Sequence, residues 1–159
     1  MARQFLGNIN SGTPGLIFLG SNGTGKNHLS IAIVREAIEK CGKTALITKV
    51  RKLDRAIKEA WRNDGYESAA IKKFIEPYIL VIDEVGLQRG SETEMLHLAE
   101  VIDERYEAMK PTILCGNLTL AELTGIIGDR AIDRFREGGH IVLFNWESYR
   151  KKNRLKTTA

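Results

Sequence analysis

The feature that most constrains this chain is a glycine-rich loop between an apolar run and a helical pattern. Residues 16–19 are all apolar, and a Gly-x4-Gly-Lys string follows them directly. Glycines let backbone N–H groups turn toward phosphate oxygens, and the next helix adds the positive end of its dipole. Lys26 can reach terminal phosphates as a point charge. The predicted nucleotide-binding residues are Gly20, Ser21, Asn22, Gly23, Thr24, Gly25, Lys26, Asn27 and His28.

Asn27 stands where such loops usually carry Ser or Thr, whose hydroxyl contacts Mg²⁺. An amide oxygen is also a hard oxygen donor, so Asn27 is a candidate metal contact together with Asp83 and water. The alternative is that Asn27 only caps the helix. The pattern leaves both interpretations open.

Polar side chains also follow two other apolar runs. Asp83 and Glu84 come directly after residues 78–82, and Asn117 follows residues 112–116. In phosphate-loop folds the Asp at such a strand end holds Mg²⁺, and an adjacent Glu can orient or deprotonate the attacking water. The carboxyl ends of parallel strands meet at the ligand crevice, so Asn117 is expected to contact water or the γ-phosphate unless it is only a turn residue. We therefore predict a metal ligand in Asp83 and catalytic roles for Glu84 and Asn117.

Composition narrows the class of protein. A chain of 159 residues with 43% hydrophobic content fits one domain with a real core. It has no apolar stretch of the ~18 residues that a membrane-spanning helix needs, and its first residues lack the apolar segment of a secretory signal. The two cysteines, Cys41 and Cys115, and the three scattered histidines have no metal-ligand spacing. We expect a reduced cytoplasmic protein with no membrane partner.

Short apolar runs alternate with helical patterns. The apolar runs cover residues 16–19, 45–50, 78–82, 112–115 and 141–144, and the helical patterns cover residues 29–40, 52–63, 67–74, 93–109 and 120–135. This alternation predicts an α/β fold with a five-stranded, mostly parallel sheet covered on both faces. Residues 1–150 then form one domain, and residues 151–159 form a basic flexible tail.

The helix after the glycine-rich loop has a predicted packing face and a predicted end. Ile31, Val34, Ala37 and Ile38 share one side at helical spacing. Gly42 follows the last helical position, where glycine is the usual C-terminal cap.

Basic residues gather in the second helical pattern. Net charge is +4, which permits nucleic-acid binding without showing it. Arg51, Arg55, Lys58 and Arg62 share one helical face. The opposite, apolar face is predicted to hold Leu53, Ile57, Ala60 and Trp61. A basic stripe of this kind can follow a single-stranded phosphate backbone, and the alternative is an ordinary solvated surface.

Two arginines lie four residues apart in a late helical pattern. Arg130 and Arg134 therefore share a face, with Asp129 and Asp133 nearby. An arginine in such a place can enter a neighbouring subunit and stabilise charge on a transferring phosphate. From spacing alone, a solvated face with local ion pairs is the simpler interpretation.

Four strings together change this balance: residues 23–29 (GTGKNHL), 80–86 (LVIDEVG), 128–134 (GDRAIDR) and 144–150 (FNWESYR). With them the chain resembles the AAA+ ATPase domain of the DnaC-type replicative helicase loaders and, more distantly, the IstB-type transposition ATPases. The last string is the most specific, because nothing in general phosphate-loop chemistry requires it. The resemblance covers roughly residues 13–150, and Lys-Asn-His-Leu recurs in DnaC-type loaders.

The resemblance implies a slow, assembly-dependent ATPase that uses ATP and Mg²⁺ in DNA replication. It implies that Asn117 is a polar sensor, that Arg134 is a trans-acting arginine finger, and that Arg130 is a weaker candidate for that role. It also implies three partners: single-stranded DNA at the basic stripe, other copies of the chain when ATP is bound, and the replicative helicase. Family loaders dock on the helicase through an N-terminal region. Here the first strand begins near residue 15, and no room follows the fifth strand for a full helical lid.

Three other functions fit the same residues. An IstB-like transposition helper ATPase would prefer duplex DNA. A non-hydrolysing ATP-sensing module would bind a partner without turnover, as the unusual Asn27 and the missing lid suggest. A small-molecule kinase is disfavoured by Glu84, because a kinase must exclude an activated water.

Overall fold

The computed structural model describes residues 2–9, 15–64, 67–86 and 91–149. The predicted basic tail, residues 151–159, lies outside this part of the chain. The described strands form a five-stranded sheet in the order β2-β3-β4-β1-β5, and every neighbouring pair is parallel. The strands are β1 Gly15–Gly20, β2 Ala45–Lys49, β3 Ile79–Val85, β4 Thr112–Gly116 and β5 His140–Phe144.

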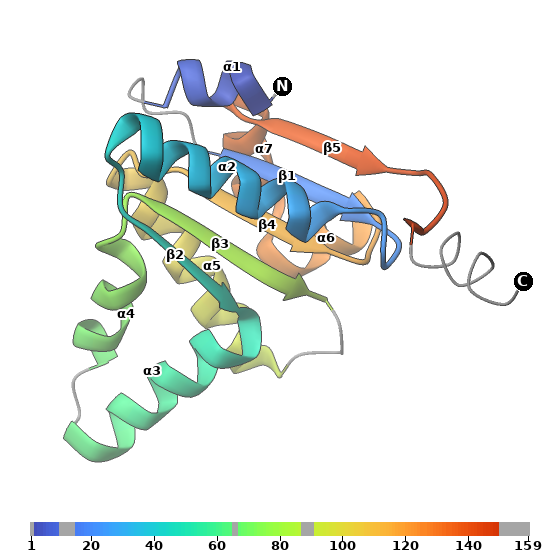
Figure 1. Ribbon diagram of the computed structural model, residues 1–159. Coiled ribbons are helices and arrows are strands. Elements are labelled where there is room, and N and C mark those ends of the chain that lie inside the picture. The colour runs from blue at the N-terminus through green and yellow to red at the C-terminus, as the bar shows by residue number, and fades with distance from the viewer. Residues whose placement is uncertain (1, 10–14, 65–66, 87–90, 150–159) are drawn as a thin grey trace, which may run out of the picture.

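Helices cover both faces of this sheet (Figure 1). Side chains alternate along each strand, so that Leu16 and Phe18 of β1 face one layer whereas Ile17 and Leu19 face the other. The first layer contains α1 Ala2–Gly7 and α2 Lys26–Cys41. The second layer contains α3 Val50–Asp64, α4 Glu67–Ile75, α5 Glu92–Glu107, α6 Leu120–Ile127 and α7 Asp129–Gly138. The predicted three-layer α/β fold is confirmed, and α1 is a helix that the sequence pattern did not predict.

The packing face of α2 differs from the predicted one. Ile33, Val34 and Ala37 are buried, whereas Ile31 and Ile38 are 53% and 48% exposed. The predicted face was therefore wrong in two of its four positions. Helical spacing alone cannot separate two overlapping apolar faces, and the sheet selects the one that contains Ile33. Gly42 does cap the helix, with φ 61°: its N–H donates to Ile38 O, and the N–H of Lys43 donates to Ala37 O.

The single helical pattern over residues 120–135 divides into two helices at Gly128. This residue has φ 82° and ψ 158°, and its N–H donates to Thr124 O, which ends α6. Thr119 begins α6 with a capping box, in which its hydroxyl accepts from Glu122 N while the Glu122 carboxylate accepts from Thr119 N. Gly128 is also the N-cap of α7, so this position turns the chain between two helices.

A buried arginine joins the second helical layer to the sheet. Arg105 of α5 is fully buried, and its guanidinium donates to Thr112 Oγ1 and to the carbonyl oxygens of Phe74, Ile75, Pro77, Tyr78 and Pro111. Burial lowers the pKa of Arg105 to about 10, so the group stays charged at neutral pH. Sequence reasoning missed this residue. None of the described helices is long and apolar enough to cross a membrane.

Candidate functional site

A cavity of about 1170 Å³ lies at the carboxyl edge of the sheet. Its walls combine residues 22–28 of the glycine-rich loop, Asp83 and Glu84 of β3, Gly116 and Asn117 at the end of β4, and residues 146, 147 and 149 after β5. Ligand pockets of roughly 300–1,000 Å³ hold drug-sized molecules, so this cavity has room for a nucleotide. The fold therefore brings the predicted loop and strand-end residues into one place.

The loop presents free backbone N–H groups at the start of α2. Gly23 and Gly25 have φ 81° and 100°, the left-handed region that side chains other than glycine rarely adopt. Gly25 is the N-cap and has no side chain to satisfy the first N–H groups of the helix. Thr24 Oγ1 braces the turn by donating to Ser21 O at 2.8 Å. Such an end binds anions through its N–H groups and its dipole.

Lys26 is the first residue of α2, directly after the loop, and its side chain is mostly buried. Its Nζ donates to Gly20 O at 2.5 Å and to Ser21 O at 2.7 Å. Burial lowers the pKa of Lys26, and the nearby Asp83 opposes that shift. A phosphate here would exchange these neutral carbonyl acceptors for charged oxygens. The ammonium is thus held at the floor of the loop, within reach of a bound anion.

Asn27 connects the loop to the acidic strand end. Its Nδ2 donates to Asp83 Oδ2 at 2.5 Å, across 56 residues of sequence. The capping interpretation is wrong, because the N-cap is Gly25 and the Asn27 side chain is engaged by Asp83. The metal contact of Asn27 stays a prediction. The contact to Asp83 places Asn27 beside the carboxylate that would share the metal ion with it.

Glu84 is held in an unusual backbone conformation by a bulge in β3. Ile82 pairs with Leu114 and Val85 with Gly116, so two residues of β3 oppose one residue of β4. Glu84 has φ 60°, which is uncommon for a residue other than glycine and concentrates at functional sites. The bulge explains why both Asp83 and Glu84, although adjacent in a strand, line the same cavity.

A lysine on the neighbouring strand holds the Glu84 carboxylate. Lys49 ends β2, and its Nζ donates to Glu84 Oε1 at 2.5 Å. This hydrogen bond to Glu84 raises the pKa of Lys49. Sequence reasoning missed Lys49, because the pairing depends on β2 lying beside β3. A polar residue at the end of a predicted neighbouring strand is the signal that could have indicated it.

The segment after β5 is fastened to the loop. Trp146 Nε1 donates to Thr24 O at 3.0 Å, and Tyr149 N donates to Gly23 O at 3.0 Å. The Trp146 ring packs on Phe144, with ring centroids 4.8 Å apart. This is the string that phosphate chemistry does not require, and it closes the cavity on the β5 side. Arg150, its last residue, lies outside the described residues.

The oxygen ligands that the cavity offers suit a Mg²⁺ ion that is bound together with phosphates. Within residues 2–9, 15–64, 67–86 and 91–149, no three His, Cys, Asp or Glu side chains gather to hold a metal ion by themselves. Mg²⁺ in nucleotide sites usually takes one or two carboxylates, substrate phosphates and water. The nearby Cys115 thiol shares a hydrogen bond with the Ser30 hydroxyl. Burial raises the pKa of this thiol to about 12, so it stays neutral and is not a metal ligand of the thiolate kind.

The sequence that builds this cavity matches a known protein family. Residues 9–157 match the protein family described as "IstB-like ATP binding protein". The chain belongs to this family.

Individual relatives agree with this assignment. The replicative helicase loader DnaC of Escherichia coli K12 is 37% identical over 153 residues, which cover 95% of this chain and 62% of that protein. A crystal structure of the DnaC helicase loader superposes with TM-score 0.77 and 25% identity, over 89% of this chain and 85% of that one. The replication initiator DnaA bound to AMPPCP and single-stranded DNA superposes with TM-score 0.75 and 27% identity, over 98% and 49% of the two chains.

These likenesses establish the AAA+ phosphate-loop fold and homology to the DnaC helicase loaders. The chain spans about three-fifths of the length of the curated DnaC proteins that it matches. The glycine-rich loop therefore belongs to an IstB-like ATP-binding domain.

The two arginines proposed as fingers of this IstB-like domain lie in different surroundings. Arg134 is mostly buried, pairs with Asp103 of α5, and its guanidinium lies 4.3 Å from the centroid of the Tyr106 ring. Arg130 is exposed on the same helix. A role for Arg134 in another subunit requires that its pair with Asp103 opens, whereas Arg130 already faces solvent.

The basic stripe of the IstB-like domain lies along α3, which leads away from the phosphate-loop end of the molecule (Figure 1). Arg51, Arg55, Lys58 and Arg62 line one groove of about 430 Å³. The groove also contains Asp54 and Glu59, which reduce its positive charge. Leu53 and Ile57 are buried on the other side, whereas Trp61, one turn beyond Ile57 near the end of α3, is 66% exposed.

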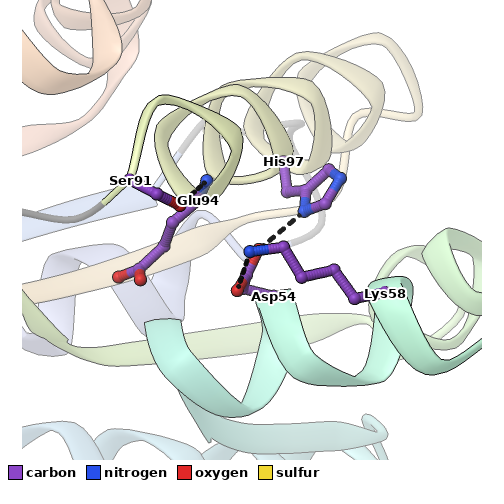
Figure 2. Close-up of polar contacts among 5 residues, drawn as sticks. All are labelled: Asp54, Lys58, Ser91, Glu94 and His97. Carbon is purple, nitrogen blue, oxygen red and sulfur yellow. Dashed lines mark hydrogen bonds and ion pairs between the residues drawn. The ribbon is translucent and has the colours of Figure 1, made fainter.

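A polar cluster attaches this helix to α5 (Figure 2). Asp54 lies between two partners: Lys58 Nζ donates to its Oδ2 at 2.8 Å, and His97 Nδ1 lies 2.9 Å from its Oδ1. Ser91 caps the start of α5 by accepting from Glu94 N (Figure 2). Lys58 therefore has part of its charge neutralised within the protein.

Proposed function

We propose that this domain binds ATP and slowly hydrolyses it, and acts as a nucleotide-controlled switch on single-stranded DNA in helicase loading. One observation supports this most strongly. The anion-binding loop and the two strand-end carboxylates meet in one cavity, where Asn27 contacts Asp83 and Lys49 contacts Glu84.

The residues present fit ATP with Mg²⁺. The N–H groups of the loop and the Lys26 ammonium would hold the phosphates, while Asp83, with Asn27 beside it, would hold the metal ion. When bound, Mg²⁺ neutralises charge that develops on the phosphate oxygens. Asn117, exposed at the end of β4, would contact the γ-phosphate or the attacking water.

Glu84 would take the proton from the attacking water, and Lys49 would control when it does so. While Lys49 donates to Oε1, that carboxylate oxygen is occupied and is not available to the attacking water. Release of that contact frees Glu84 for the water. The slow basal turnover that we propose follows from this arrangement.

Completion of the site requires a second copy of the chain. An arginine finger supplies a rigid, permanently charged fork for phosphate oxygens, and it accelerates hydrolysis about 10³–10⁵-fold in phosphate-loop enzymes where it acts. Arg134 is the proposed finger and Arg130 is the second candidate. The pair with Asp103 would open when subunits assemble.

Single-stranded DNA would bind along α3, and the replicative helicase would be the protein partner. The DnaA relative is bound to single-stranded DNA, and the DnaC relatives are helicase loaders. The groove lined by Arg51, Arg55 and Arg62 offers positive charge at helical spacing. Such contacts weaken with salt because binding releases counterions.

The test of this function is phosphate release, measured with and without single-stranded DNA. Turnover that rises with DNA and disappears in Glu84→Gln supports an ATPase. Tight ATP binding with no turnover under any condition instead favours the non-hydrolysing module, which the Lys49–Glu84 contact also permits. A stronger affinity for duplex than for single-stranded DNA favours the transposition helper, which the family match also permits.

The shared site is tested by mixing two inactive variants, Arg134→Lys and Glu84→Gln. Lysine keeps the charge beside Asp103 but removes the fork. Recovered phosphate release in the mixture supports an arginine that acts in trans. A mixture that stays inactive, although both variants co-assemble, excludes Arg134 from that role, and the same pairing with Arg130→Ala then tests the second candidate.

A further inference from the structure

The string after β5 contains exposed aromatic surface that phosphate binding does not use. Trp146 is 52% exposed and Tyr149 is 69% exposed, and both line the cavity. Large aromatic side chains lose a favourable burial energy when they stay exposed, so aromatic groups at a ligand cavity need a physical explanation.

The strand order decides on which side of the loop these rings lie. β1, which leads into the loop, has β4 on one side and β5 on the other. Asp83, Glu84 and Asn117 therefore lie beyond the β4 side, and Trp146 follows β5 on the opposite side. A nucleotide whose terminal phosphate faces the carboxylates must extend its other end toward β5.

The Trp146 ring is held in place before any ligand binds. Its Nε1 donates to Thr24 O at 3.0 Å, and the ring packs on Phe144 at an interplanar angle of 43°. Phe144 in turn packs edge-to-face on Phe18 of β1. The indole is thus oriented by the loop at one edge and by the core on one side, while the remaining surface faces the cavity.

We propose that Trp146, with Tyr149 in the same cavity wall, is the platform on which the base of the bound nucleotide stacks. This inference rests on the proposed function and specifies the nucleoside end of that same site. Base–aromatic stacking depends on a π-face and tolerates different bases, so it adds affinity for nucleotides over inorganic polyphosphates. Because Trp146 Nε1 also donates to Thr24 O, a base stacked on the indole would be linked through this hydrogen bond to the phosphate-binding loop.

Two ligands separate a base platform from a structural fastening of the loop. ATP carries a base, whereas inorganic tripolyphosphate carries only the phosphates. We expect Trp146→Ala to weaken ATP binding about 10-fold in calorimetric titrations, and tripolyphosphate binding less than about 2-fold. Trp146→Phe keeps a π-face and should retain most of the ATP affinity. Leu143→Ala, an exposed apolar truncation on β5, is the matched control and should bind both ligands as the unchanged protein does.

Fluorescence provides a second readout that needs no truncation at this position. The chain has two tryptophans, so Trp61→Phe leaves Trp146 as the sole indole. ATP should change its emission, and tripolyphosphate should displace ATP without producing the same change.

Each outcome decides the proposal. Equal weakening of both ligands by Trp146→Ala, or no weakening of either, overturns the platform. An emission that responds identically to ATP and tripolyphosphate overturns it as well. If neither ligand binds the unchanged protein, both this inference and the proposed function are wrong. If ATP binds and depends on Lys26, but Trp146→Ala leaves the ATP affinity unchanged, the proposed function stands and only the platform is wrong.

Discussion

Replacement of Lys26 by alanine should weaken ATP binding by a predictable amount. A hydrogen bond to a charged group is worth about 1.5–3 kcal/mol. Lys26 already donates to Gly20 O and Ser21 O, so ATP exchanges two neutral acceptors for charged ones instead of creating contacts from none. The variant therefore loses only the difference in strength between hydrogen bonds to phosphate oxygens and hydrogen bonds to carbonyl oxygens. The lower end of the range of about 1.5–3 kcal/mol applies for this reason. About 1.5 kcal/mol corresponds to roughly a 10-fold increase in Kd.

The same substitution also lowers the stability of the fold. It removes two contacts that tie the helix start to the loop, each worth about 0.5–1.5 kcal/mol in neutral cases. Loss of about 1–3 kcal/mol lowers Tm by several degrees for a domain of this size. The folded variant can therefore be assayed at 20 °C.

Calorimetric titration with ATP measures the effect, and Lys40→Ala is the matched control. Lys40 lies in the last turn of the same helix, where it is exposed and pairs with Glu36. Its removal should leave the ATP affinity unchanged. A Lys26→Ala variant that is folded and binds ATP within about 3-fold of the unchanged protein would refute the phosphate-loop assignment.

Three further substitutions test the contacts described above. Lys49→Ala frees Glu84 and should raise basal phosphate release; because the Lys49 and Glu84 side chains are both partly exposed, thermal stability should not change. Unchanged or lower turnover would contradict control of Glu84 by Lys49. Asp54→Asn removes the carboxylate that neutralises Lys58, so single-stranded DNA should bind more tightly and with a steeper salt dependence, measured in anisotropy titrations. Weaker binding would exclude the α3 groove as the DNA surface. Arg105→Lys offers fewer donors to six acceptors, three of them in fully buried contacts, and should cost about 3 kcal/mol or more in the free energy of unfolding, which urea denaturation measures. A cost below about 1 kcal/mol would show that the carbonyl oxygens find other partners.

Much of the site could be predicted because its parts are local. The glycine-rich loop depends on residues that are adjacent in the chain, and its chemistry is readable from glycines followed by Lys26. Asp83 and Asn117 could be assigned to one edge because parallel strands place their carboxyl ends together. The alternation of apolar runs with helical patterns was sufficient for the three-layer fold.

Other features depended on pairings between distant segments. The conformation of Glu84 arises from the bulge that β3 forms against β4, and its contact to Lys49 requires β2 as the neighbour of β3. Helical spacing placed Arg134 and Arg130 on one face but could not show that Tyr106 and Asp103 of another helix cover the first of them.

The sequence by itself determined which functional groups the candidate site contains: the glycine-rich loop with Lys26, the carboxylates of Asp83 and Glu84, and the amide of Asn117. Local backbone preferences and side-chain functional groups decide these properties, and they are present before the chain folds. The tertiary structure decided the orientation and availability of each group. Asn27 contacts Asp83 across 56 residues, and Trp146 contacts Thr24 across 122, because the sheet order brings their elements together. Such contacts depend on the sum of all packing interactions, which no short segment of the sequence encodes.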